Sequence, residues 1–141
     1  MRGIPGSGKT TWAKKMWPDA VHCSADHYFT QEGEYRFDAQ LLKEAHRACF
    51  DKFKRALYDK APIIVVDNTN TRLFEFAHYI YEALMMDDYE VRVVRTECSV
   101  ETAAARGTHG VPSHKVAEMA ARMRPYYNEA ILNTEIEREI A

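Results

Sequence analysis

A glycine-rich segment near the start of the chain restricts its fold more than any other feature of the sequence. Residues 3–10 read GIPGSGKT, and the helix-forming run TWAKKM follows. This spacing matches the pattern G-x-x-x-x-G-K-[ST], in which glycines allow a tight turn that points backbone N–H groups inward. The positive end of the following helix lies at the same point, so the loop attracts anionic oxygens. The sequence therefore predicts a phosphate-binding loop, and with it an α/β fold of the P-loop NTPase type.

The residues of this loop have separate expected roles. Lys9 would place its charge between the outer phosphates of a nucleotide, and the Thr10 hydroxyl would bind Mg²⁺. The predicted nucleotide-binding residues are Gly3, Pro5, Gly6, Ser7, Gly8, Lys9, Thr10 and Thr11. The guanine-specific pattern N-K-x-D is absent from the sequence. Its absence favours ATP over GTP as the nucleotide. The alternative is a glycine-rich turn that matches the pattern by chance.

The segment before the loop is short for a fold of this type. A P-loop ordinarily follows a buried apolar strand, yet only Met1 and Arg2 precede Gly3. Either the chain begins inside a longer protein, or it lacks its central strand. We therefore expect the first strand of the sheet to be missing or truncated.

Length and composition are those of one globular domain. The chain has 141 residues, 46% of them hydrophobic and 28% charged, so we treat residues 1–141 as a single domain. The sequence has no apolar run of membrane-spanning length and no signal peptide at its start, which favours a cytoplasmic location without membrane association. Cys23, Cys49 and Cys98 are far apart and odd in number, which indicates buried thiols rather than disulfides or a zinc site.

The charge distribution leaves contact with nucleic acid open. A net charge of -2 argues against a surface that is basic throughout. Two local clusters remain, formed by Lys52, Lys54 and Arg55 and by Lys115, Arg122 and Arg124. Each cluster is either a phosphate-binding groove or a solvated helix face. The sequence does not indicate an oligomeric state.

Hydrophobic periodicity predicts alternating helices and strands. We expect helices over residues 9–16, 42–57, 77–84 and 116–127, with Asp38 as the N-cap of the second, Ser99 as the N-cap of a further short helix, and Pro125 disturbing the last. We expect strands over residues 20–24, 63–67 and 89–93. This succession implies right-handed crossovers and a parallel sheet flanked by helices. Residues 128–141 stay open: Ile131, Leu132, Ile136 and Ile140 could form a further helix, and no closing strand is evident.

Two aspartates follow predicted strands. Asp26 comes directly after the strand at 20–24, and Asp67 ends the β-branched run at 63–67. In open α/β sheets, ligands bind in the crevice outside the carboxyl ends of the strands. We therefore expect both carboxylates to face the phosphate-binding loop.

Four segments together resemble a known family. They are GIPGSGKTTWA at 3–13, CSADHY at 23–28, VVDNTN at 65–70 and RGTHGVP at 106–112. In order and spacing they resemble the kinase domain of phage-type 5′-hydroxyl polynucleotide kinases, and more broadly the zeta-toxin and AAA-like P-loop kinases and the kinase-like half of cyclic-nucleotide phosphodiesterases. The resemblance spans nearly the whole chain. It implies a kinase-like domain with a helical lid over about residues 103–124, which uses ATP and Mg²⁺.

The resemblance also implies roles for individual residues. Lys9, Asp26 and Arg106 match catalytic residues, with Asp26 as general base and Arg106 as a lid arginine that reaches the donor phosphates. Asp67 would bind Mg²⁺ together with Thr10. Each assignment has an alternative: a turn-capping role for Asp26, an Asx turn made by Asp67 or Asn68, and an exposed helix end for Arg106.

The sequence departs from the phage-type pattern at one position. Where those kinases carry an arginine that holds the 3′-phosphate of the acceptor, this chain has Phe29. The missing charge could come from Arg36 or Arg72, and Tyr28, Phe29 or Tyr35 could stack on a base.

Three functions fit these observations. The first is an ATP-dependent kinase that transfers the γ-phosphoryl group to a nucleic-acid 5′-hydroxyl or a nucleotide. The second is a P-loop kinase that acts on a small metabolite or resembles the toxin-like kinases. The third is a nucleotide-binding module with little catalytic activity.

Overall fold

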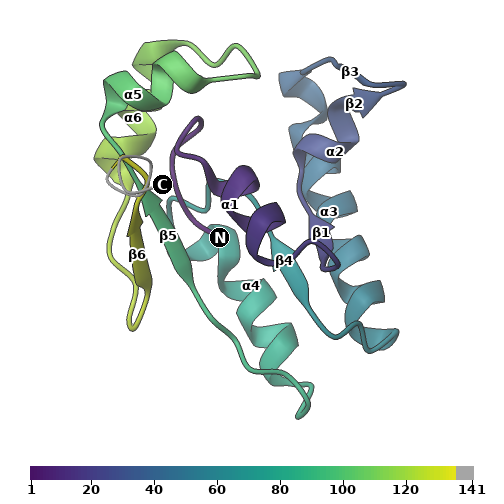
Figure 1. The fold of residues 1–141 in the computed structure, drawn as a ribbon. Coiled ribbons are helices and arrows are strands. Elements are labelled where there is room, and N and C mark those ends of the chain that lie inside the picture. Colours follow the sequence, from purple (N-terminus) through teal and green to yellow (C-terminus); the bar gives the residue numbers. More distant parts are fainter. Residues whose placement is uncertain (136–141) are drawn as a thin grey trace.

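Parallel strands form the centre of the structure, a computed structural model that describes residues 1–135. Strand β1 (Val21–Cys23) pairs with β4 (Ile64–Val66), and β5 (Val94–Glu97) pairs with β6 (Ala130–Asn133). Both pairs are parallel, which confirms the parallel sheet expected from the strand and helix pattern. Figure 1 shows the two pairs side by side, with the start of the chain between them.

The segment before the phosphate loop takes the central position in this arrangement. Arg2 forms an isolated parallel bridge with Arg95, and its backbone N–H donates to the carbonyl of Val94 at 2.8 Å. On the other side, the amino group of Met1 donates to the carbonyl of Val66 at 2.8 Å. Met1 and Arg2, where we expected a missing or truncated strand, therefore lie between β4 and β5. They form a single β-bridge and not a full strand.

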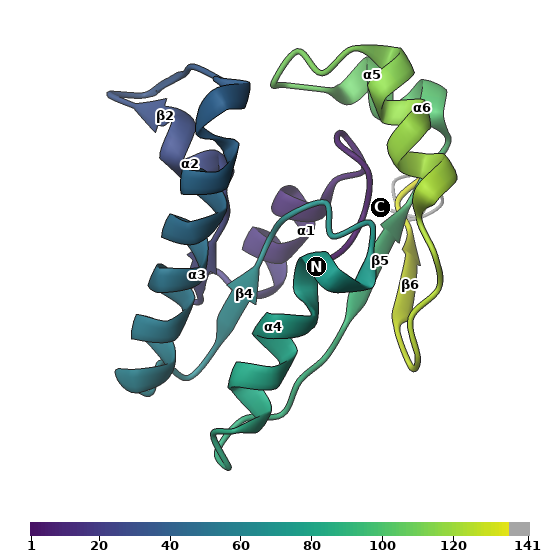
Figure 2. The same ribbon diagram turned by 180° about the vertical axis from the view of Figure 1, so that it is seen from behind.

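Helices cover both faces of the sheet. Helix α1 (Lys9–Met16) lies on one face, and α3 (Leu42–Tyr58) and α4 (Leu73–Leu84) lie on the other (Figures 1 and 2). The apolar spacing of three and four residues in α3 places one side of that helix in the core, as predicted. The buried side chains of this core are Cys23, Ala25, Phe29, Ala45, Cys49, Phe53, Leu57, Phe76, Tyr79 and Ala83.

Short elements connect β1 to α3. They are α2 (Asp26–Phe29), β2 (Thr30–Gln31), β3 (Glu34–Tyr35) and the 3-10 helix η1 (Ala39–Leu41). Strands β2 and β3 form an antiparallel hairpin, called the β2–β3 hairpin below. The Asp38 carboxylate accepts the backbone N–H of Gln40 at 2.9 Å, so the predicted N-cap caps the 3-10 turn that leads into α3.

The strand predicted over residues 89–93 is wrong in its bounds. Strand β5 begins at Val94 and not at Tyr89. Val94 is the residue whose carbonyl accepts the N–H of Arg2 and which pairs with Ala130 of β6. Tyr89 and Val91 are partly buried against the core, which explains their alternation with polar residues. Apolar alternation reports burial, whereas a strand also needs neighbouring backbone to bond with.

Two helices after β5 form a separate packed unit, called the α5–α6 pair below. Ser99 caps α5 (Val100–Arg106) by accepting the N–H of Thr102, as predicted. Helix α6 (Ser113–Arg122) ends before the predicted Tyr127 because Pro125 disfavours helical backbone at the residue before it and removes a donor. The α5–α6 pair packs around a small apolar core. The buried side chains of this core are Ile4, Ala103 and Val116, and partly buried side chains surround them: Cys98, Val100, Val111, Met119, Ala120 and Met123.

The chain after α6 returns to the sheet. The further helix that Ile131 and Leu132 suggested is not formed, because these residues belong to β6. This strand pairs with β5, and its side chains are mostly exposed, so it lacks the continuous apolar run of a central strand. Ile136 and Ile140 lie outside the described residues.

The cysteines are free, as expected. Cys23 and Cys49 are buried and Cys98 is half-buried. Among residues 1–135, none of the helices has both the length and the apolar character needed to cross a bilayer.

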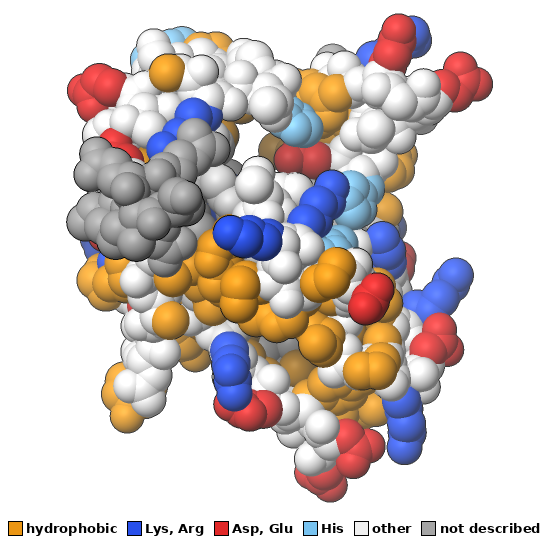
Figure 3. Space-filling model, viewed as in Figure 1, with side chains coloured by type: hydrophobic (Ala, Val, Ile, Leu, Met, Phe, Trp, Pro, Cys, Tyr) orange, Lys and Arg blue, Asp and Glu red, His pale blue; other side chains and the backbone are white. Residues whose placement is uncertain are grey.

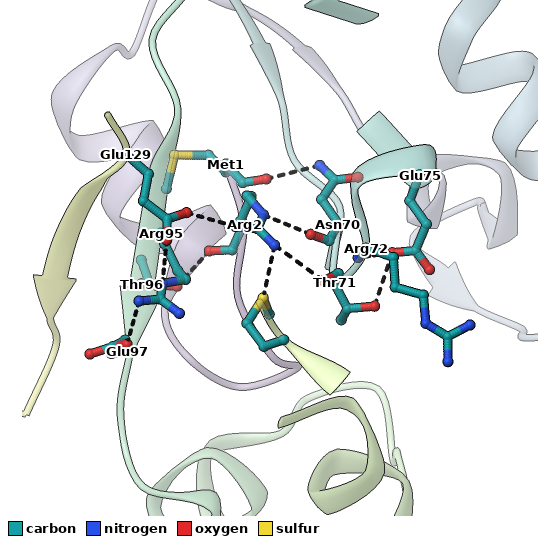
Figure 4. A network of polar contacts seen from close by, with 11 residues as sticks. Met1, Arg2, Asn70, Thr71, Arg72, Glu75, Arg95, Thr96, Glu97 and Glu129 are labelled. Carbon is teal, nitrogen blue, oxygen red and sulfur yellow. Dashed lines mark hydrogen bonds and ion pairs between the residues drawn. The ribbon is translucent and has the colours of Figure 1, made fainter. Parts of the chain in front are cut away.

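One fully buried guanidinium stands out near the centre of the sheet. Arg2 is 2% exposed, and its Nε donates to the carbonyl of Asn70 at 2.8 Å. Its Nη1 donates to Glu129 at 2.7 Å, and its Nη2 donates to the carbonyl of Thr71 at 3.1 Å. The guanidinium also lies 4.7 Å from the ring centre of Phe76. Figure 4 shows how these groups converge on Arg2 from different parts of the chain.

We expect this guanidinium to be critical for stability. Arg2→Met keeps an unbranched stem but leaves Glu129 without its closest cation, so the free energy of unfolding should fall by about 3–5 kcal/mol. Arg36→Met is the matched control, because Arg36 pairs with Glu34 on the surface, where both side chains are exposed. That variant should lose less than about 1 kcal/mol. Urea unfolding of both variants measures the difference, and equal losses would contradict a special role for Arg2.

Candidate nucleotide-binding and phosphoryl-transfer site

The phosphate loop joins the central segment to α1. Gly8 stands at the N-cap of α1 with φ 90°, and Gly6 has φ 81°, both in the region that favours glycine. A methyl group at Gly6 would lie 1.9 Å from the carbonyl oxygen of Ala103 in α5. The loop therefore needs glycine at this position both for its backbone angles and for its close approach to the α5–α6 pair.

Lys9 is folded back into the loop. Its side chain is buried, and its Nζ donates to the carbonyl of Ile4 at 3.0 Å, the carbonyl that also accepts the N–H of Ser7. Burial lowers the pKa of the Lys9 ammonium, while the carboxylates of Asp67 and Asp26 act in the opposite direction. Both aspartates that follow strands therefore contribute to the electrostatic environment of this ammonium.

Thr10 and Asp67 form the pair expected at a metal site. The Thr10 hydroxyl donates to Asp67 Oδ2 at 2.5 Å, and Asp67 is only 6% exposed. Its other oxygen, Oδ1, is buried and has no hydrogen-bond partner within the described residues. A buried carboxylate oxygen beside a hydroxyl suits Mg²⁺, which takes one or two protein oxygens and completes its shell with water and substrate phosphate. Among the described residues no group of three His, Cys, Asp or Glu side chains could hold a metal ion.

Asp26 stands at the start of α2, immediately beyond β1. Its side chain is exposed, and its Oδ1 accepts the hydroxyl of Tyr35 at 3.2 Å. It is not a turn cap, because its side chain bonds to Tyr35 and not to the backbone of α2. The turn between β1 and Asp26 is held by a residue that follows β4, since Asn68 Oδ1 accepts the N–H of Ala25 at 2.9 Å. Asn68 thus ties the Asp26 turn to the Asp67 turn and does not form an Asx turn.

The other predicted loop residues differ in where they point. Ser7 is fully buried, and its hydroxyl lies 2.6 Å from the hydroxyl of Thr96 in β5, so its side chain faces the protein. Gly3 lies against the same threonine. Pro5 is half-buried, and Thr11 is exposed on α1. Ser7 therefore anchors the loop to β5, whereas the N–H of Gly3 donates to the carbonyl of Thr69 at 3.0 Å. The sequence had indicated only ligand binding for both residues.

Arg106 reaches the edge of the phosphate loop from the end of α5. Its Nη1 donates to the hydroxyl of Thr134 at 3.2 Å. Thr134 is buried, and its methyl group would lie 3.7 Å from a Cβ at Gly8. Arg106 is half-buried rather than on an exposed helix end, and Thr134 links it to the loop. Thr134 was missed because it follows β6, whose strand character the sequence did not reveal.

The acceptor-side candidates are divided between core and surface. Phe29 is 4% exposed and packs edge-on against Tyr28, Tyr35 and Phe37, so it is not available to stack on a base. Arg36 is exposed and engaged with Glu34 at 2.6 Å. Arg72 and Tyr28 are exposed as well.

The loop, the buried Lys9 and the Thr10–Asp67 pair define a P-loop nucleotide-binding domain of the kinase-like type. Residues 1–126 match the protein family described as AAA domain, and the chain belongs to this family. The match includes all of the phosphate loop, both aspartates and Arg106.

Curated relatives share this region as a small part of larger proteins. Human NEDD4-binding protein 2 is 30% identical over 141 residues, which cover 94% of this chain and 8% of the relative. YLP motif-containing protein 1 is 27% identical over 147 residues in both human and rat, covering 85% of this chain. The alignment spans 7% of the human and 11% of the rat protein. The chain therefore corresponds to a small portion of the length of these relatives.

The contact of Gly6 with α5 gives a sharp test of the loop. Gly6→Ala should displace the loop or α5 and reduce ATP affinity at least tenfold, because the new methyl group would overlap the carbonyl of Ala103. Gly33→Ala is the matched control, since Gly33 has φ 83° but no atom within 4 Å of a new Cβ. It should cost only the backbone strain, about 1 kcal/mol of stability, with ATP affinity kept. Calorimetric titration with ATP compares the two, and similar affinities for both variants would contradict the packing argument.

Proposed function

We propose that this domain is an ATP-dependent kinase that transfers the γ-phosphoryl group to a hydroxyl of a nucleic acid or nucleotide. The observation that carries the proposal is the grouping of a P-loop lysine with two strand-end carboxylates in different surroundings. Asp67 is buried and bonded to Thr10, whereas Asp26 is exposed and reachable by a second substrate. A kinase needs these two kinds of carboxylate, one for the metal side and one for the acceptor side.

On the donor side, Lys9 must leave the carbonyl of Ile4 to reach a phosphate. The exchange replaces a hydrogen bond to a neutral carbonyl by one to an anion, which is the stronger kind. Asp67 Oδ1 and the Thr10 hydroxyl would hold Mg²⁺, which neutralises charge on the phosphates. Arg106 would approach the outer phosphates from the α5–α6 pair, in the role of a lid over residues 103–124.

On the acceptor side, Asp26 would accept the proton of the acceptor hydroxyl. The hydroxyl oxygen forms a bond to the γ-phosphorus while the bond from that phosphorus to the β–γ bridging oxygen breaks, and ADP leaves with the electron pair. Asp26 Oδ1 is bonded to Tyr35, so Oδ2 is the oxygen that takes the proton. The resemblance to 5′-hydroxyl polynucleotide kinases makes a nucleic-acid or nucleotide hydroxyl the proposed acceptor.

The first experiment is a transfer assay that separates the two substrate sides. With labelled ATP and a panel of 5′-hydroxyl oligonucleotides, nucleosides and sugars, Asp26→Asn should lower kcat by about 10² to 10⁴, with ATP affinity little changed. Lys9→Ala should lower kcat/KM for ATP by at least about 10². The matched controls are Asp19→Asn, at the opposite end of β1, and Lys15→Ala, on the exposed face of α1. Both should retain wild-type rates.

The pattern of transfer decides between the candidate functions. Label on oligonucleotides or nucleotides supports the proposal, and label only on sugars or other small molecules indicates a small-metabolite kinase. Tight ATP binding without transfer to any acceptor indicates a nucleotide-binding module. A large loss of ATP affinity in Asp26→Asn with kcat preserved would instead make Asp26 a donor-side residue.

A second test concerns Arg106. Arg106→Ala should lower transfer by roughly 10² to 10⁴, as for loss of a charge contact made in the transition state. Hydrogen exchange over residues 103–124 should slow when a non-hydrolysable ATP analogue and Mg²⁺ are added, because the α5–α6 pair would close over the nucleotide. Arg124→Ala is the control, since Arg124 is exposed and its hydrogen bonds within residues 1–135 go to carbonyls near the end of α6. Unchanged exchange together with an active Arg106→Ala variant would contradict the lid role.

A further inference from the structure

The carboxylate of Asp26, the proposed general base, needs a neighbour that fixes its orientation. Asp26 is exposed, and an exposed carboxylate rotates freely unless a neighbour fixes it. Its backbone is well held, since its N–H donates to the Ser24 hydroxyl at 3.2 Å and its carbonyl accepts the Thr30 hydroxyl at 3.1 Å. For the carboxylate itself, the hydrogen bond from Tyr35 at 3.2 Å is the one seen in the described structure. A proton acceptor must be aligned with its substrate to be effective, so this contact matters.

Tyr35 is well suited to hold that carboxylate. It lies in β3 and pairs with Thr30 of β2, so the hairpin fixes its backbone. Its ring packs edge-on against the buried Phe29, with 6.2 Å between ring centres. Burial, together with the Asp26 carboxylate, raises the pKa of the Tyr35 hydroxyl, so the hydroxyl keeps its proton and remains a donor at neutral pH.

The second neighbour of the Tyr35 ring comes from the other side of the site. His109 belongs to residues 107–112, the loop between α5 and α6, and its ring centre lies 3.9 Å from that of Tyr35 at an interplanar angle of 79°. Figures 1 and 2 show this loop extending towards the β2–β3 hairpin above the phosphate loop. Figure 3 shows the surface hollowed between these two parts. The contact is therefore a bridge over the site.

This bridge connects the two halves of the proposed mechanism. Arg106 lies three residues before His109 in the same segment, and Tyr35 bonds directly to Asp26. A movement of the α5–α6 loop that displaced His109 would remove one of the contacts of the ring that carries the Tyr35 hydroxyl. The contact between His109 and Tyr35 therefore links the segment that carries Arg106 to the residue that bonds to Asp26.

We propose that Tyr35 is the positioning residue that orients Asp26, and that the α5–α6 loop holds Tyr35 in place through His109. This proposal rests on the proposed function, because the hydrogen bond from Tyr35 can aid catalysis only if Asp26 accepts a proton. It makes Tyr35 act through Asp26 and not on the substrate.

The catalytic test uses variants that keep the ring or remove the contact. Tyr35→Phe retains the ring and loses only the hydroxyl, so kcat should fall about 10- to 100-fold while KM for ATP and the melting temperature stay unchanged. Tyr58→Phe is the control, because Tyr58 is a largely exposed tyrosine at the end of α3. His109→Ala should lower kcat in the wild-type background and have little further effect in Tyr35→Phe, since both act through one hydroxyl. Additive effects would show that His109 acts independently and would overturn the coupling.

A second measurement does not depend on turnover. In the ligand-free protein, Tyr35→Ala should speed hydrogen exchange of residues 107–112, because the loop loses its contact, whereas Tyr58→Ala should not. Unchanged exchange overturns the bridge. Wild-type transfer with an unchanged kcat in Tyr35→Phe overturns the positioning role alone. Absence of transfer by the wild type to every acceptor overturns the proposed function and the positioning role with it, while the exchange result still decides the bridge.

Discussion

The buried guanidinium of Arg2 joins three parts of the chain that are far apart in sequence. It bonds to the carbonyls of Asn70 and Thr71 after β4 and to the Glu129 carboxylate before β6. Removing a guanidinium from water is costly, and here the cost is offset by a carboxylate, two carbonyls and an aromatic face. Glu129 also lies 3.1 Å from Arg95, which pairs with Glu97, so two cations and two anions balance each other beside the sheet (Figure 4). Because Arg2 immediately precedes the loop, the same contacts fix where the loop begins.

These contacts extend step by step to the residues of the candidate site. The turn after β4 is held on one side by Arg2, and Asn70 in turn donates to the carbonyl of Met1 at 2.9 Å. On the other side the same turn carries Asp67, bonded to Thr10, and Asn68, bonded to the backbone next to Asp26. One turn therefore sets the separation between the Asp67 and Asp26 carboxylates, to which the proposed function gives the metal side and the acceptor side. Placement of such groups to within a fraction of an ångström is what a site of this kind requires of its scaffold.

The sequence predicted those parts of the structure that local patterns determine. Helix α1 has its predicted bounds, and the apolar face of α3 and the cap at Ser99 were identified, because each depends on neighbours within a few residues. Asp38 was recognised as a cap, but it caps the 3-10 turn before α3 and not α3 itself. The parts that long-range pairing determines were missed: β5 starts at Val94 because Arg2 reaches it there, and β6 forms because β5 offers a free edge. In the candidate site, the spacing of the motifs predicted Lys9, Thr10, Asp26, Asp67 and Arg106, and their roles stay predictions. Thr134 and the hydrogen bond from Tyr35 to Asp26 were not predicted, since they join segments with no common pattern.

The position of Phe29 constrains how an acceptor can be recognised. An arginine at this 4% exposed site would have to give up its hydration among aromatic rings, because Tyr28, Tyr35 and Phe37 surround it. The chain has instead used the position to pack the β2–β3 hairpin, which presents the Tyr35 hydroxyl to Asp26. In the proposed function, a charged acceptor would then be bound by surface cations. Arg36 is in the same hairpin and already pairs with Glu34, but exposed pairs of this kind are worth little, so a phosphate can replace the carboxylate at small cost. Binding of the proposed acceptor on this side would therefore be weak and dependent on ionic strength, and its selectivity would arise more from shape around Asp26 than from a dedicated phosphate pocket.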